Sequence, residues 1–346
     1  MTETTNFTLP QKPIKYDRAI GVWLLTVAVF IALIVLVGGL TRLTDSGLSI
    51  TEWKPVTGAL PPLSHEAWLE EFEKYKQIPE YSQVNQGMTL SEFEWIYWWE
   101  WSHRLLARMV GFIFLIPMLW FIAKGRITRA EAPRFVTLFI LGGAQGALGW
   151  FMVASGLTDR VDVSQYRLAA HLSVAVLLFG MIFWTALRYM TKDREVGPPD
   201  VAVPARLFVG LVFLQIVSGA FVAGIHAGHI YNTWPLMDGA FIPDGLYGSD
   251  LASFEDHLTV QFNHRMLAYT VFAGGIGLWL GARTQNLTPT MTRALHLLLG
   301  MLCLQVVLGI ATLLTVVPIG LAAAHQMGAI VLFAAAINFA FRLNPR

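Results

Sequence analysis

Charged side chains and cysteine are both scarce in this sequence, and each shortage excludes a class of protein. Only 14% of the 346 residues are charged, against about 25% in ordinary soluble domains, while 55% are hydrophobic and the mean hydropathy is +0.54. The single cysteine excludes an intrachain disulfide framework and a cysteine-ligated zinc or iron–sulfur site. The formal charge of +1 shows no bias towards nucleic acid. What remains is a polytopic membrane protein.

Long apolar runs make up most of the chain. A spanning helix needs roughly 20 mostly apolar residues, and eight stretches meet that length. They lie at about 19–40, 103–123, 135–155, 168–189, 206–226, 263–282, 294–314 and 320–341. Alternate connections, beginning with the N-terminal segment, hold fifteen Lys and Arg, and the opposite connections hold six. By the positive-inside rule both termini face the cytoplasm, and the long loops 41–100 and 227–260 face outward.

The two halves of the sequence resemble each other. The run His103-Arg104-Leu105-Leu106-Ala107 recurs as His264-Arg265-Met266-Leu267-Ala268, and further matches keep the same order. A repeat of four spans keeps its orientation, which predicts two parallel four-helix bundles around an axis along the membrane normal. The expected parts are a cytoplasmic segment 1–18, a first repeat 19–190 with the outer loop 41–100, a linker 191–205, a second repeat 206–341 and a cytoplasmic tail 342–346. The fold class predicted is all-α, with eight transmembrane helices.

Four of the nine histidines fall on repeated positions, namely His103, His171, His264 and His325. Each lies in the first turns of a span that runs inward, so the four imidazoles share one depth near the outer face. Ionisable groups inside spans are expensive and usually functional. Two facing imidazoles per repeat suit axial ligation of a haem iron, whereas zinc needs three or four converging ligands. The alternative is that they are hydrogen-bonded packing residues.

Three arginines lie inside the predicted spans beside these histidines: Arg104, Arg108 and Arg265. The two His-Arg pairs are repeated, which favours pairing of the arginines with haem propionates. The alternative is that they extend to lipid phosphate at the outer interface.

A carboxylate breaks the symmetry of the two repeats. Glu100 precedes His103 by three residues, and this spacing places both on one helix face. The matching residue of the second repeat is Gln261, which carries no charge. We therefore expect chemistry in the first repeat and a permanent cofactor in the second. The alternative is that Glu100 is a solvated loop residue.

One histidine pair has no counterpart in the first repeat. His226 and His229 are spaced as His-x-x-His at the end of a predicted span. A polar loop and a minor metal site are the two interpretations, of which the loop is favoured.

Several of these motifs together resemble one known family. They are Gly38-Gly39-Leu40-Thr41-Arg42-Leu43-Thr44-x-Ser46-Gly47-Leu48-Ser49-Ile50, Trp53-Lys54-Pro55-Val56-x-Gly58-x-Leu60-Pro61-Pro62, Glu100-Trp101-x-His103-Arg104, His171, Asn263-His264-Arg265 and His325-Gln326. The chain resembles haem A synthase over nearly its whole length. The long first loop is similar to the alphaproteobacterial and mitochondrial subgroup. The outer-loop cysteine pair of other members is absent, so no thiol relay is expected.

The resemblance implies a role for each matched residue. In the family, the histidines matching His264 and His325 hold a resident haem b, and those matching His103 and His171 flank the site of the substrate haem. With the propionate pairing expected above, Arg265 is assigned to the haem b site and Arg104 to the substrate-haem site. The family's catalytic carboxylate matches Glu100.

The resemblance also implies the reaction and its setting. An oxidoreductase of this family converts the C8 methyl group of haem O to a formyl group by two hydroxylations, and the resulting geminal diol loses water. The implied cofactor is haem b, which passes electrons while the protein supplies orientation and proton exchange. The implied location is the bacterial inner membrane, the implied purpose is cytochrome oxidase assembly, and protohaem farnesyltransferase is the expected donor of haem O. A homo-oligomer is left open, and a nucleic-acid partner is not expected.

Two alternatives of other classes remain at this point. A di-haem electron-transfer protein of the cytochrome b561 type would use the same four histidines, with haem b permanently bound at both sites. The missing second carboxylate and the long outer loop argue against it, because a relay needs neither. A transporter or haem channel is the other alternative, and the placement of most prolines in loops or near span ends disfavours it.

Overall fold

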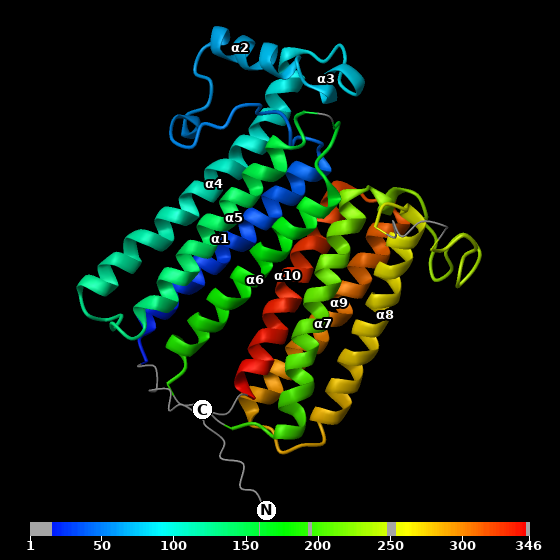
Figure 1. Ribbon diagram of the computed structural model, residues 1–346. Coiled ribbons are helices and arrows are strands. Elements are labelled where there is room, and N and C mark those ends of the chain that lie inside the picture. Colours follow the sequence, from blue (N-terminus) through cyan, green and yellow to red (C-terminus); the bar gives the residue numbers. More distant parts are fainter. Residues whose placement is uncertain (1–15, 159, 193–195, 248–253, 344–346) are drawn as a thin grey trace, which may run out of the picture.

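The computed structural model describes residues 16–158, 160–192, 196–247 and 254–343 (Figure 1). No strand occurs among them, which confirms the predicted all-α class. The elements are α1 (Arg18–Leu43), η1 (Thr57–Ala59), α2 (His65–Tyr75), α3 (Pro79–Gln83), α4 (Leu90–Ala123), α5 (Ala132–Ala154), α6 (Gln165–Met190), α7 (Pro199–Gly224), η2 (Ala227–His229), α8 (His257–Ala282), α9 (Pro289–Leu314) and α10 (Ile319–Arg342).

The chain is a multi-pass membrane protein. Among the described residues, seven helices are long and apolar enough to cross a membrane: α1, α4, α5, α6, α7, α9 and α10. The eighth expected span, 263–282, falls on α8, which has 26 residues and is not among these seven; its outer turns carry the polar residues Gln261, His264 and Arg265. The count of eight spans and the orientation stay predictions. Residues 1–15, 193–195 and 344–346 of the expected cytoplasmic segments lie outside the described residues.

The long helices form two groups of equal make-up. In the first group α1 packs against α4 and α6, and in the second α7 packs against α8 and α10. The groups meet where α6 lies against α7 and where α1 and α6 lie against α10. Figure 1 shows α4 and α5 on one side of this seam and α8 and α9 on the other, with α2 and α3 projecting from one end.

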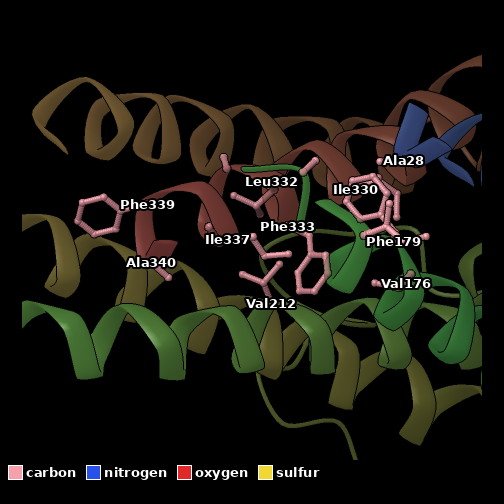
Figure 2. Packing of buried hydrophobic residues seen from close by; sticks show 14 of the residues in the cluster. Ala28, Val176, Phe179, Val212, Ile330, Leu332, Phe333, Ile337, Phe339 and Ala340 are labelled. Carbon is pink, nitrogen blue, oxygen red and sulfur yellow. The ribbon is translucent and has the colours of Figure 1, made fainter. Parts of the chain in front are cut away.

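Close packing of large and small residues holds the seam together. Lipid is as apolar as these side chains, so helices associate through van der Waals contact and not through the hydrophobic effect. Phe179 of α6, Val212 of α7 and Phe333 of α10 are all buried (Figure 2). A Cβ at Gly180 would lie 3.1 Å from the Phe333 ring and 3.2 Å from Ile337. Glycine at this position therefore lets α6 approach α10 closely.

The outer loop of the first group is an ordered layer with its own core. Ser64 caps α2 by accepting a hydrogen bond from the Ala67 amide, and Phe72 and Tyr75 of α2 are buried. A capping box of Thr89 and Glu92 starts α4. With 34 residues, α4 is about 51 Å long, which exceeds a hydrocarbon core of about 30 Å. Residues 90–100, expected in the loop, are thus the outer turns of α4 and carry this layer.

Candidate functional site

The four repeated histidines lie on four different helices, and the structure brings them together in two pairs. His103 of α4 lies near His171 of α6, and His264 of α8 lies near His325 of α10. All four histidines are partly buried, being neither fully enclosed nor exposed. Each pair therefore belongs to one group of helices, as the repeat predicts.

A glycine on a neighbouring helix lies against each of these imidazoles. A Cβ at any of the four glycines would approach a ring atom to between 2.7 and 3.3 Å. The contacts are Gly38–His103, Gly149–His171, Gly219–His264 and Gly309–His325. Because real Cβ atoms rarely come so close, a larger residue would displace the ring or the helix. Sequence reasoning assigned these glycines no function, although Gly149 and Gly309 each follow a glutamine, Gln145 or Gln305, by four residues in the two repeats.

Three of the imidazoles also contact a glutamine amide on the adjacent helix. The amide nitrogen lies 3.0 to 3.1 Å from the imidazole Nδ1 and donates to the backbone carbonyl of the same histidine at 2.8 to 3.2 Å. The pairs are Gln145–His171, Gln215–His264 and Gln305–His325. A hydrogen bond at Nδ1 fixes the ring of a histidine whose other nitrogen binds a metal. These glutamines therefore orient the rings.

The paired imidazoles fit axial ligation of a haem iron. Each pair offers two nitrogen ligands from separate helices, with space made by glycine. The Oε1 atoms of Gln145, Gln215 and Gln305 are buried without a hydrogen-bond partner. The amide nitrogen, and not this oxygen, faces the ring and donates to the histidine's own carbonyl, so each glutamine holds its histidine in place through its N–H group. The donor set in both repeats is thus suited to a bis-histidine haem.

The Glu100 carboxylate is buried and fully hydrogen-bonded. Its side chain is 3% exposed, which excludes the interpretation as a solvated loop residue. The Ser49 hydroxyl donates to Oε2 at 2.8 Å and the Ile50 amide at 2.7 Å. Arg104 donates to Oε1 from Nε at 3.1 Å and from Nη2 at 2.6 Å. Charge-assisted bonds of this kind hold the carboxylate in one position.

Arg104 also ties the outer loop to α4. It donates to the carbonyl oxygens of Ile50 at 2.9 Å and Glu52 at 3.1 Å. Arg108, one turn further on, donates to the carbonyl of Pro55 at 2.9 Å. Its Nη1 is buried and has no hydrogen-bond partner, so it is a donor left for an anionic ligand. Pairing with propionates stays a prediction for these arginines.

The same arrangement recurs in the second repeat without the negative charge. Arg265 donates to the carbonyls of Tyr231 at 2.6 Å and Thr233 at 2.8 Å, which are the positions equivalent to Ile50 and Glu52. It also donates to Oε1 of Gln261 at 2.9 Å, and the Gln261 amide donates to the Ala227 carbonyl. The amide thus preserves the structural part of the Glu100 site and lacks its capacity to exchange a proton.

Comparison with known proteins decides the family. The COX15-CtaA model, described as cytochrome oxidase assembly protein, matches residues 21–337. The chain belongs to this family. It is 53% identical over 329 residues to a protein of Parvibaculum lavamentivorans (strain DS-1) named "Heme A synthase", covering 94% of each chain. It is 50% identical over 339 residues to one of the same name from Bradyrhizobium sp. (strain ORS 278), covering 96% of this chain and 94% of the other. These bacterial relatives and the apolar helices place it in the bacterial inner membrane.

The first residue of the His-x-x-His motif, His226, joins the two repeats in this structure. The His226 ring contacts Arg42, at the end of α1, and Asp162 Oδ2 at 3.1 Å. Arg42 itself forms an ion pair of 2.6 Å with Asp162. The rings of His226 and His229 have centroids 6.2 Å apart. His226 is therefore a polar loop residue, as the favoured interpretation holds, and it links the end of α1 to the end of α7.

Proposed function

We propose that this chain catalyses the synthesis of haem A, oxidising the C8 methyl group of haem O to a formyl group in the inner membrane. The observation that carries the proposal is the buried Glu100 on the helix of His103, where the second repeat has the uncharged Gln261, in a chain 53% identical to a protein named "Heme A synthase". An electron relay between two permanent haems has no use for such a difference between its sites. The product would serve the assembly of cytochrome oxidase.

The first repeat, residues 19–190, is the proposed substrate side. His103 and His171 would hold the iron of haem O from opposite faces, with Arg104 and Arg108 near the outer loop for the propionates. The unpartnered Nη1 of Arg108 supports this placement. Protohaem farnesyltransferase is the proposed source of haem O, and its transfer within the membrane requires that the two proteins meet.

The second repeat, residues 206–341, is the proposed site of a resident haem b. His264 and His325 would be its ligands, oriented by Gln215 and Gln305. The Nε atom of Arg265 is buried without a partner and is the donor left for a propionate. When bound, haem b would supply electron transfer to the first repeat, the kind of chemistry that a protein leaves to its cofactor.

The protein's own part in the reaction is orientation and proton exchange. Oxidation of a methyl group to a formyl group breaks C–H bonds and removes electrons from the carbon, so protons must be exchanged at the site together with the electrons. Glu100 is the proton-exchanging group on the helix of His103, and Arg104 keeps its Oε1 in place. The outer layer above Ser49 and Ile50 shields this carboxylate from bulk water, so exchange is confined to the site.

Haem extraction tests the proposed function directly. The purified protein would be prepared with and without a source of haem O, and the extracted haems separated by chromatography. We expect haem A or its alcohol intermediate only when haem O is supplied, together with haem b in both preparations. Two equivalents of haem b per chain, and no haem A in either preparation, would instead identify an electron relay.

A further inference from the structure

The four imidazoles are not equally supported. Within the described part of the chain, the His103 ring has no hydrogen bond, whereas His171, His264 and His325 each contact a glutamine. The His103 ring is also turned differently against its glycine. At Gly38 the nearest ring atom to a built Cβ is Nε2, at 2.9 Å, whereas at the other three glycines it is Cε1.

The sequence of α1 explains this difference. Gly38 of α1 and Gly219 of α7 contact the equivalent rings of His103 and His264. One helical turn before each glycine lie Ile34 in α1 and Gln215 in α7. Position 215 supplies the amide that contacts His264 at 3.1 Å, and the aliphatic side chain at position 34 has nothing to donate.

His103 also lacks a second polar partner, because α1 has an aliphatic residue where α7 has a serine. Ser218 Oγ lies 3.3 Å from His264 Nδ1. The equivalent residue of α1 is Val37. Both polar partners of His264 on α7 are therefore replaced by aliphatic residues on α1, while the glycine that makes room for the ring is kept.

An iron ligand without such a partner binds more weakly. A hydrogen bond at the second imidazole nitrogen fixes the orientation of a ligating ring, and loss of such a partner typically weakens metal binding by about 10- to 100-fold. In the first repeat this applies to one side only, because Gln145 still contacts His171 at 3.0 Å. In the second repeat both rings are supported, by Gln215 and Gln305.

We propose that His103 is the exchangeable ligand of the first-repeat haem, so that its iron opens to a small external ligand on the α4 face while the second-repeat haem stays closed on both faces. Gln145, Gln215 and Gln305 are positioning residues that keep the other three ligands bound. The inference rests on the proposed haem ligation by the two histidine pairs. The two repeats would then differ in two respects: the Glu100 carboxylate is present only in the first, and only in the second is each of the two histidines contacted by a glutamine.

Exchanging the residue types at positions 34 and 215 tests whether the glutamine contact decides which haem binds an external ligand. Ile34→Gln supplies the missing amide to His103, and Gln215→Ile removes it from His264. The purified full-length chain, loaded with haem O and chemically reduced, would be titrated with carbon monoxide and followed by absorption spectroscopy. We expect one haem of the wild type to bind carbon monoxide, Ile34→Gln to weaken that binding by about 10- to 100-fold, and Gln215→Ile to let the second haem bind it.

Controls separate this result from misfolding and from failure of the proposed function. Leu33→Gln and Leu214→Ile change neighbouring, exposed positions of α1 and α7 and should leave carbon monoxide binding as in the wild type. Equal binding to both haems of the wild type, or no response to Ile34→Gln, would overturn the inference. If His103→Ala and His264→Ala each kept both haems with unchanged spectra, the ligation itself and the proposed function would be wrong.

Discussion

The Glu100–Arg104 pair allows a prediction in which the second repeat serves as the reference. Replacing Arg104 by Met would leave the Glu100 carboxylate 3% exposed and without its counter-charge. Breaking a buried pair in this way costs about 3–5 kcal/mol. Glu100→Gln has a smaller effect, because an amide oxygen accepts from Arg104 just as Gln261 accepts from Arg265 at 2.9 Å.

The cost of Glu100→Gln follows from the hydrogen bonds. With its oxygen turned to Arg104, the new amide presents N–H to the Ile50 amide, which now donates to Oε2 at 2.7 Å. One buried donor loses its acceptor, at about 1–3 kcal/mol. Arg104→Met combined with Glu100→Gln should be more stable than Arg104→Met alone, because no unpaired charge is left.

Thermal unfolding of the purified variants in detergent measures this order, and haem extraction measures activity. We expect Glu100→Gln to retain bound haem and to accumulate unoxidised or partly oxidised haem O, since an amide exchanges no proton. Gln261→Ala is the matched control in the second repeat and should not block oxidation directly. The reasoning is refuted if Glu100→Gln destabilises the protein as much as Arg104→Met, or if it loses haem and activity in equal measure.

Two further predictions concern haem content and pH. In Gly309→Val a branched side chain occupies a position where even a Cβ lies 2.8 Å from the His325 ring, so haem in the second repeat should fall by about tenfold. The control Gly300→Val, on the same helix with open space around it, should keep the haem absorption of the wild type. Glu80, in the outer layer, is 4% exposed, and burial followed by the negative charge of Glu100 raises its pKa to about 8, from an ordinary 4.5. The folded layer then binds a proton that the unfolded chain releases, so its stability falls as pH rises from about 4.5 to about 8. Proteolysis of the outer layer at a series of pH values should show this fall in the wild type and lose it in Glu80→Gln; an unchanged pH profile would contradict the assignment.

The histidine pairs and Glu100 show which features of the site could be predicted from residue type and spacing along the chain. Composition predicted the membrane, and the recurrence of His-Arg predicted two pairs at one depth, because both properties depend on residue type and spacing along one chain. Residue type and spacing did not decide whether Glu100 has a chemical role or is a solvated loop residue. Its burial depends on Ser49 and Ile50 folding back over α4, which helical periodicity does not contain.

The sequence by itself determined the all-α membrane class, the duplicated order of motifs and the residues able to bind a haem. Tertiary structure decided which neighbour each of these residues has. The contact of Gln215 with His264, and its replacement by Ile34 near His103, depends on how α7 and α1 are rotated against α8 and α4. That rotation is set by side-chain packing between helices, since in lipid the apolar faces alone do not distinguish one neighbour from another.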